Sequence, residues 1–380
     1  MNRSFDPMTD SPLAGSKRLI VKVGTALLTD AATGRLRRRW ISALADDVAA
    51  LRAAGTETLI VSSGAVAVGR HTLGLLGRPL KIEEKQAAAA AGQIRLSAVW
   101  QDVFARRGIP VAQILLTPGD TEERRRHLNA RNTIEALLGL GAIPVINEND
   151  TVATEEIRFG DNDRLAARVA QMVGADMLVL LSDIDGLYDA DPRLSKDAAF
   201  IEEIAEITPE IEAMAGEAGP GYSSGGMVTK IAAANIATRA GCAVVIADGK
   251  KTHRLATLGI SGRHTIFRPV AERATARKRW IAGTVQPAGA ITVDAGAVKA
   301  LGAGKSLLPA GVVAIEGTFE RGDAVVIRGG NGQRIGAGLI AYSSEDAQRI
   351  AGHKSREIEQ RLGYRGRDEM IHRDDLVLDG

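Results

Sequence analysis

Leu19-Ile20-Val21-Lys22-Val23-Gly24-Thr25 is a short apolar run that carries one lysine and ends at a glycine. Similar β-branched runs recur at residues 58–62, 111–116, 143–147, 177–181 and 243–247, each bounded by Gly, Asp or Pro. Stretches rich in Ala, Leu and Arg with helical spacing lie between them, at residues 41–54, 83–107, 129–140, 163–173 and 227–240. This alternation predicts βαβ units around a largely parallel, buried sheet, that is, a three-layer α/β/α sandwich.

The pattern changes after residue 281, where glycine-rich turns separate short β-like runs. These runs lie at residues 290–293, 311–316, 324–327 and 335–340, and a short helix is expected at 344–350. A small β-rich domain at the C-terminal end accounts for this pattern. We therefore predict two domains, a catalytic domain over 17–270 and a β-rich domain over 285–375.

Composition excludes several classes of function. With Lys+Arg 48 against Asp+Glu 46, the net charge of +2 is too balanced for strong binding to a nucleic-acid backbone. The first sixteen residues contain no apolar segment, so neither a signal peptide nor a membrane anchor is expected. The single cysteine, Cys242, lies in an apolar run and fits a buried thiol in the reducing cytoplasm.

Two common nucleotide-binding motifs and a zinc site find no support. Gly304-Lys305-Ser306 resembles the end of a P-loop, but Lys299 occupies the position of its first glycine. No G-x-G-x-x-G follows the first predicted strand, which removes the main support for a dinucleotide site. Six scattered histidines and one cysteine form no zinc-binding pattern.

Lys22 is the first candidate for phosphate chemistry. A lysine inside an apolar strand is costly to bury unless an anion meets it, and Gly24 beside it lets a phosphate approach backbone N–H groups. The alternative is an edge strand whose lysine reaches out to solvent.

Ser62-Ser63-Gly64 follows the second strand and leads directly into a helical stretch. Ligands bind at the carboxyl ends of the strands in such sheets, and a helix N-terminus there can hold an anionic group of a substrate. Simple capping of the helix by Ser63 is the alternative.

The densest polar cluster comprises Asn147-Glu148-Asn149-Asp150 and, about ten residues later, Gly160-Asp161-Asn162-Asp163. It predicts carboxylates and amides around one cavity at the edge of the sheet. The alternative is that these residues only cap the helix that begins near Asp163. Capping, however, needs a single such residue, and the cluster has many.

Ser182-Asp183 ends another strand, and Ser223-Ser224-Gly225-Gly226 leads into a helix that begins near Thr229-Lys230. A glycine pair before a helix suits a loop that folds over phosphate and delivers an ammonium group. A plain linker is the alternative.

Together these segments resemble the amino-acid kinase family, which phosphorylates carboxylates, carbamate or nucleoside monophosphates with ATP and has no P-loop. The resemblance extends through residues 17–375 and is strongest to members that act on glutamate. Its motifs, in the family's order, are residues 21–25, 63–64, 147–150, 160–163, 183–188 and 225–230. The C-terminal part resembles a PUA domain through residues 306–311, 319–323 and 372–375.

The resemblance implies roles for individual residues. Lys22 and Lys230 would contact the transferred phosphate from opposite sides, and Asp161 would hold both ammonium groups. Glutamate would be bound by Ser63, Gly64, Asp150 and Asn162. ATP would be held by Lys22, Ser182, Asp183, Ser224, Gly225, Gly226, Met227, Val228, Thr229 and Lys230.

The implied reaction is ATP-dependent phosphorylation of the L-glutamate side-chain carboxylate to L-glutamyl 5-phosphate, the first step of proline biosynthesis. That carboxylate is ionised at pH 7, its reference pKa being about 4.3, so no general base is needed. Mg²⁺ is expected to bridge the ATP phosphates with few direct protein ligands. The resemblance also implies inhibition by proline and a homodimer or homotetramer.

Two alternatives remain open. A sibling kinase acting on N-acetylglutamate, aspartate or carbamate would use the same phosphate-binding residues. An RNA-binding protein is the other, because PUA domains usually accompany RNA enzymes, although the near-neutral charge makes nucleic acid an improbable partner.

Overall fold

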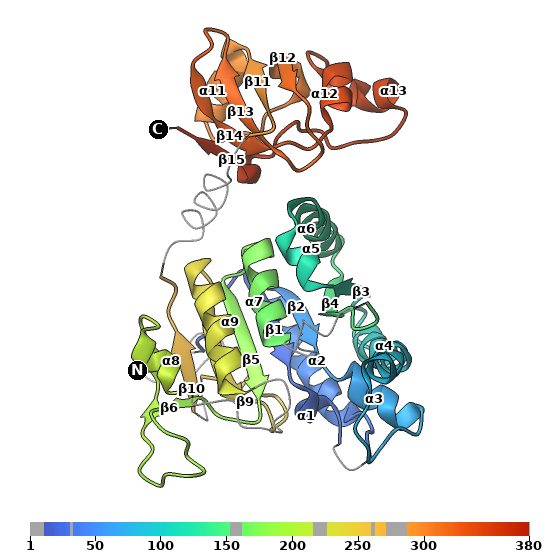
Figure 1. Ribbon diagram of the computed structural model, residues 1–380, viewed down its shortest axis with the longest axis vertical. Helices are drawn as coiled ribbons and strands as arrows, with labels where there is room; N and C mark the ends of the chain where they lie inside the picture. Colours follow the sequence, from blue (N-terminus) through green and yellow to red (C-terminus); the bar gives the residue numbers. More distant parts are fainter. Residues whose placement is uncertain are drawn as a thin grey trace, which may run out of the picture. The chain divides into compact units, whose positions relative to one another are not determined.

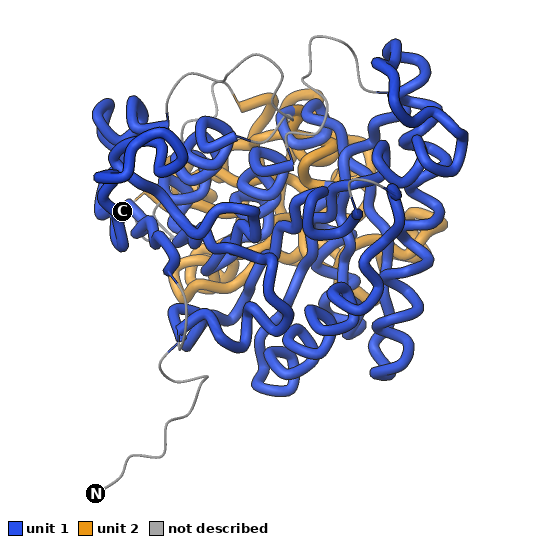
Figure 2. The backbone as a smooth tube through the Cα atoms, turned by 90° about the horizontal axis from the view of Figure 1, so that it is seen from below, with its two compact units in different colours: residues 1–122, 129–273 blue, residues 123–128, 274–380 orange. Residues whose placement is uncertain are grey.

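The chain divides into two compact units in the computed structural model (Figure 2). The structure describes residues 11–30, 33–152, 162–215, 226–259, 263–270 and 287–379. Residues 1–122 and 129–273 form the first unit, and residues 123–128 and 274–380 form the second. The domain bounds 17–270 and 285–375 stay a prediction, because residues 271–286 at the junction lie outside the described ranges.

The first unit is built on a sheet in which β1 occupies the centre, between β2 and β5 (Figure 1). In sheet order its strands are β3 Val111–Leu116, β4 Ile143–Glu148, β2 Glu57–Ser62, β1 Arg18–Val23, β5 Met177–Ser182, β9 Ala243–Asp248, β10 His264–Phe267 and β8 Glu203–Ile204. All neighbouring pairs are parallel except β9 and β10. The carboxyl ends of the central strands therefore meet at one edge.

Helices cover both faces of this sheet. They are α1 Thr25–Leu28, α2 Arg38–Ala53, α3 Ala65–Thr72, α4 Ile82–Ala105, α5 Pro118–Glu122, α6 Arg124–Gly139, α7 Asn162–Val173, α8 Pro209–Ala213 and α9 Met227–Arg239. A two-stranded hairpin pairs β6 Leu187–Tyr188 with β7 Phe200–Ile201.

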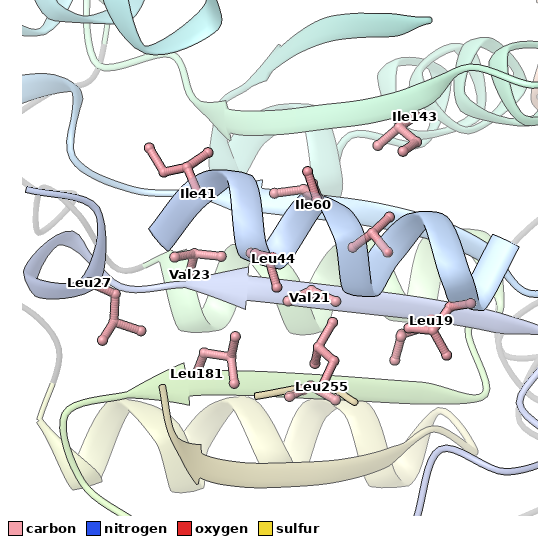
Figure 3. Packing of buried hydrophobic residues seen from close by; sticks show 14 of the residues in the cluster. Leu19, Val21, Val23, Leu27, Ile41, Leu44, Ile60, Ile143, Leu181 and Leu255 are labelled. Carbon is pink, nitrogen blue, oxygen red and sulfur yellow. The ribbon is translucent and has the colours of Figure 1, made fainter. Parts of the chain in front are cut away.

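Alternation along β1 assigns its side chains to two hydrophobic clusters. Leu19, Val21 and Val23 pack with residues of α2 and α4, whereas Ile20 packs with residues of α6, α7 and α9. Successive side chains of a strand point to opposite faces, so the two clusters lie on opposite sides of the sheet. Figure 3 shows the first of them, with Ile41 and Leu44 of α2 beside β1. Burial on both faces explains why these strands are continuous apolar runs.

The predicted fold class is confirmed: a large, mostly parallel α/β sheet is followed by a β-rich C-terminal domain. Each of the six strands predicted in the first unit is found within one residue at either end. The edge strand β8 and its neighbour β10 were not predicted, and α6 begins at Arg124, five residues before its predicted start.

The second unit contains a five-stranded sheet in the order β12-β11-β13-β14-β15. Its elements are β11 Gly289–Val293, α11 Ala295–Gly302, β12 Val312–Gly317, β13 Ala324–Gly329, β14 Arg334–Leu339, α12 Ser344–Ile350, α13 Ile358–Leu362 and β15 Leu376–Leu378. Short 3-10 turns lie at Pro309–Gly311, Ser355–Glu357 and Arg373–Asp375. The predicted helix at 344–350 is confirmed, and its N-cap is Ser343.

Glycines allow α3 and α4 to cross at very short range. A Cβ atom on Gly92 of α4 would lie 1.8 Å from the carbonyl oxygen of Ala65, the first residue of α3. A Cβ on Gly69 of α3 would lie 1.6 Å from the carbonyl oxygen of Ala88. No real Cβ atom tolerates such contacts, so a side chain at either position must push the two helices apart.

We expect Gly92→Ala to lower the free energy of unfolding by about 1–3 kcal/mol or more, because the new methyl group overlaps backbone atoms. Gly139→Ala is the matched control, since a Cβ there meets no atom within 4 Å. It should leave stability unchanged or raise it slightly. Denaturant unfolding of both variants tests this, and equal midpoints would refute the crossing argument.

Candidate active site

The carboxyl ends of the central strands are held together by backbone hydrogen bonds between the loops that follow them. The N–H of Gly24 donates to the carbonyl of Leu181 at 3.3 Å, and the N–H of Ser63 donates to that of Val23 at 3.2 Å. The N–H of Gly249 donates to the carbonyl of Ser182 at 2.8 Å. The loops after β1, β2, β5 and β9 therefore share one edge, where ligands bind in open α/β sheets.

Lys22 lies in β1, one residue before the strand ends. Its neighbours Val21 and Val23 face α2, so alternation directs Lys22 to the face covered by α7 and α9. The side chain is buried, with 6% of the residue exposed. The predicted buried lysine is thus present in a central strand, and the edge-strand alternative is wrong.

Asp163 pairs with two lysines at once. Its Oδ1 lies 2.6 Å from Nζ of Lys22, and its Oδ2 lies 3.1 Å from Nζ of Lys230. The hydroxyl of Thr229 donates to Oδ2 of Asp163 at 3.0 Å. Asp163 is in the first turn of α7 and Lys230 in the first turn of α9, and these helices pack side by side (Figure 1).

Charge explains the protonation state of this cluster. Burial opposes ionisation of Asp163, but the two ammonium groups offset it and hold the pKa of Asp163 at about 2. Two ammonium groups and one carboxylate leave a net positive charge among these three side chains. Asp163 offsets only one of these two positive charges, so the three side chains together are suited to an anionic ligand.

Asn162, beside Asp163, lies in a buried hydrogen-bond network. Its Nδ2 donates to Oγ of Ser63 at 3.0 Å and to Oδ1 of Asn147 at 2.9 Å. The N-cap of α3 is Gly64, with a φ of 101°, and no side chain caps this helix. The capping alternative for Ser63 is therefore wrong, because its hydroxyl bonds to Asn162 instead.

Two buried carboxyl groups, Glu148 and Asp150, lie near the end of β4. Burial, assisted by the charge of Glu148, raises the pKa of Asp150 to about 7. A cationic ligand would stabilise the ionised form of such a carboxyl group, because a nearby positive charge lowers its pKa again. This end of the site is electronegative, whereas the lysine cluster is electropositive.

On the predicted ATP side, the hydroxyl of Ser182 donates to Oδ1 of Asp183 at 3.1 Å. Gly226 is the N-cap of α9, and its carbonyl oxygen lies 2.8 Å from the Thr229 hydroxyl, whose one proton it shares with Asp163. Val228 is exposed, whereas Met227 packs against the cluster that includes Ile20. Ser224 and Gly225 lie outside the described residues, so their roles stay predictions.

Asp163 is the main residue that sequence reasoning missed. The role of holding both ammonium groups was assigned to Asp161, which lies outside the described residues and stays a prediction for that reason. Asp163 was included in the predicted polar cluster and at the start of a helix, but no role of its own was assigned to it. Ala166, Ala167 and Ala170 follow it at helical spacing on the buried face, and this period could have placed Asp163 toward the sheet.

Searches against known protein families match both parts of the chain. Residues 17–248 match the Amino acid kinase family, and residues 289–362 match the PUA domain. The chain belongs to the amino acid kinase family. The match covers the lysine cluster and the loops after β1, β2 and β5.

Relatives of this amino acid kinase are similar over nearly their whole length. Glutamate 5-kinase of Paramagnetospirillum magneticum is 62% identical over 370 residues, which cover 97% of this chain and 100% of that protein. Glutamate 5-kinase of Agrobacterium fabrum is 58% identical over 373 residues, covering 98% of this chain and 96% of that protein.

Within the described ranges, this amino acid kinase has no helix both long and apolar enough to cross a membrane. In the same ranges, no group of three or more His, Cys, Asp or Glu side chains is placed to hold a metal ion.

We expect Asp163→Asn to leave two buried ammonium groups without their carboxylate. The free energy of unfolding should fall by about 3–5 kcal/mol, and turnover should fall roughly a hundredfold or more. Because the pKa of Asp163 is lowered to about 2, its stabilising effect is complete above its unfolded pKa and is lost as the pH falls toward 2. The stability gap between the two proteins should therefore narrow in acid.

Denaturant unfolding at several pH values measures that gap. Asp197→Asn, at an exposed position, is the matched control and should behave like the unaltered protein. A gap that stays constant down to about pH 2 would contradict the assignment of a low pKa to Asp163.

Proposed function

We propose that this amino acid kinase transfers the γ-phosphoryl group of ATP to the side-chain carboxylate of L-glutamate. The products are L-glutamyl 5-phosphate and ADP, and the reaction is the first step of proline biosynthesis. The cluster of Lys22, Asp163 and Lys230 carries the proposal of phosphoryl transfer. Relatives named glutamate 5-kinase, at 58–62% identity over nearly the whole chain, support glutamate as the acceptor.

Phosphoryl transfer between two anions needs positive charge at the moving group. Lys22 comes from the sheet and Lys230 from α9, so the two ammonium groups approach the γ-phosphoryl group from different elements. Asp163 holds both and limits their motion, which keeps the donors oriented before the reaction begins. The residual positive charge of the cluster stabilises the charge that develops on the transferred oxygens.

The glutamate carboxylate attacks without a general base, because it is ionised at neutral pH. The task of the protein is therefore to align this carboxylate with the phosphoryl group and to exclude water. Ser63 and Gly64, at the start of α3, are proposed to bind an anionic group of glutamate through the helix N-terminus.

Asp150 and Asn162 are proposed to bind the amino end of glutamate. The buried carboxyl groups of Asp150 and Glu148 make this pocket electronegative, and a free ammonium group would compensate them. N-acetylglutamate and carbamate carry no ammonium group, so this pocket favours a free amino acid over those acceptors.

ATP is proposed to bind along Ser182, Asp183 and the residues from Ser224 to Lys230. Mg²⁺ is proposed to enter with the nucleotide as part of the co-substrate, on phosphate oxygens and water, which are ligands it prefers. The exposed Gly226 and Val228 leave the start of α9 accessible to such a ligand.

Inhibition by proline is proposed at the same pocket, because proline also carries an ammonium group next to a carboxylate. We also propose that the enzyme acts in the cytoplasm, which the single, buried thiol of Cys242 fits. A homodimer or homotetramer stays a prediction, as does the low affinity for nucleic acid.

A hydroxamate assay with ATP and a panel of acceptors tests the proposed function. Glutamate should be phosphorylated, with kcat/KM at least roughly tenfold above that of aspartate, which is shorter by one methylene group. N-acetylglutamate and carbamate should give no product above background. Preference for aspartate or N-acetylglutamate over glutamate would overturn the assignment of the acceptor.

The raised pKa of Asp150 predicts a pH dependence of glutamate binding. Below about pH 7 this carboxyl group is protonated and loses its attraction for the substrate ammonium group. The KM for glutamate should therefore be roughly fivefold higher at pH 6 than at pH 7, while the KM for ATP changes little. Asp150→Asn should raise the KM and abolish this trend. A KM for glutamate that is flat between pH 6 and 8 in the unaltered protein would exclude the proposed role.

A further inference from the structure

A chain of side-chain amides connects α4 to the proposed acceptor pocket. Nδ2 of Asn147 donates to Oε1 of Gln93 at 2.8 Å, and Oδ1 of Asn147 accepts from Nδ2 of Asn162 at 2.9 Å. Asn147 and Asn162 are buried, with 2% and 3% of each residue exposed, whereas Gln93 is half-buried. These hydrogen bonds thus link Gln93, outside the proposed acceptor pocket, to Asn162, inside it.

A backbone group fixes the direction of this chain. The N–H of Glu148 donates to Oδ1 of Asn147 at 2.9 Å, and a backbone N–H can only donate. Asn147 must therefore present its oxygen to Glu148 and Asn162, and its NH₂ group to Gln93. Gln93 in turn must present an oxygen, because it is the acceptor for that NH₂ group.

Gln93 is itself held in this orientation. Its Nε2 donates to Oγ of Ser97, one turn along α4, at 3.1 Å and to Oε1 of Gln113 in β3 at 3.3 Å. The hydroxyl of Ser97 also donates to Oε1 of Gln113. Both arms of the Gln93 amide are therefore engaged, and its oxygen stays directed at Asn147.

The far end of the chain leaves one acceptor unused. The NH₂ group of Asn162 is engaged by Asn147 and Ser63, so its Oδ1 is the remaining arm of that amide. Among the described residues, this buried oxygen has no hydrogen-bond partner. A buried acceptor without a partner is destabilising, and a ligand that donates a hydrogen bond to it would remove this cost.

We propose that Gln93 is a positioning residue for the amino end of the acceptor substrate. It holds Asn147, which holds Asn162 with its carbonyl oxygen available to the substrate ammonium group. The inference rests on the proposed function, because it requires an acceptor with a free amino group. Gln93 does not touch the substrate and acts through the two asparagines.

Gln93→Met tests the proposal, since methionine keeps the length of the side chain and removes the acceptor. The KM for glutamate should rise about tenfold, the equivalent of one charge-assisted hydrogen bond. The kcat at saturating glutamate and the KM for ATP should stay within about twofold, because the lysine cluster is not altered. Gln93→Glu keeps an acceptor oxygen for Asn147 and should restore most of the affinity for glutamate.

Glutarate, which lacks the amino group, separates positioning from general damage to the fold. In the unaltered protein kcat/KM should strongly favour glutamate over glutarate, and Gln93→Met should reduce this ratio about tenfold by weakening glutamate alone. If Gln93 had a merely structural role, Gln93→Met would lower kcat/KM equally for glutamate and for glutarate. Gln101→Met, at an exposed position of the same helix, is the matched control and should change neither value.

An unchanged ratio of glutamate to glutarate in Gln93→Met, or no recovery in Gln93→Glu, would overturn the inference. If Gln93→Met does not fold, Ser97→Ala gives the same test. The KM for glutamate should then rise two- to threefold, and an unchanged KM would overturn the inference. If the unaltered protein does not phosphorylate glutamate, the proposed function fails first, which distinguishes the two failures.

Discussion

The ion pairs of Asp163 with Lys22 and Lys230 are the interaction on which the rest of the structure depends. Three charged side chains are withdrawn from water at the carboxyl edge of an apolar sheet, at a cost of several kcal/mol for each ion. Only close pairing offsets that cost, so the ends of β1, α7 and α9 must meet at one point. The parallel sheet and the packing of α7 beside α9 satisfy this requirement.

Charge also divides the site into two ends. The lysine cluster carries a net positive charge, and the buried carboxyl groups of Glu148 and Asp150 lie near the end of β4. In the proposed function, the substrate ammonium group binds at the carboxyl groups and the side-chain carboxylate lies toward the lysine cluster. The neighbouring residues Asn162 and Asp163 connect the two ends, since one belongs to the amide network and the other to the lysine cluster.

Much of the fold followed from the sequence because buried parallel strands are apolar on both faces and are separated by strong helical patterns. Such runs end clearly at Gly, Asp or Pro. The predicted and observed ends of β1 therefore agree to within one residue. The edge strand β8 and its neighbour β10 are short and lack this signal. Their pairing depends on partners distant in the chain, which local patterns do not reveal.

The candidate site was predicted less completely. Lys22 stood out because a charge in an apolar strand demands a partner, and the motif of the glycine loop indicated Lys230. The role of holding both lysines was assigned to Asp161, which lies outside the described residues. The helical phase of α7, which directs Asp163 toward both lysines, was not used. The role of Gln93 was not visible, because it arises from contacts between α4, β3 and β4.

A crystal structure with glutamate and a non-hydrolysable ATP analogue would test the central claim most directly. We predict that the ammonium groups of Lys22 and Lys230 both lie within hydrogen-bond distance of the γ-phosphoryl group while Asp163 still contacts both. A structure in which either ammonium group points to solvent, or in which the phosphoryl group binds elsewhere, would contradict the account.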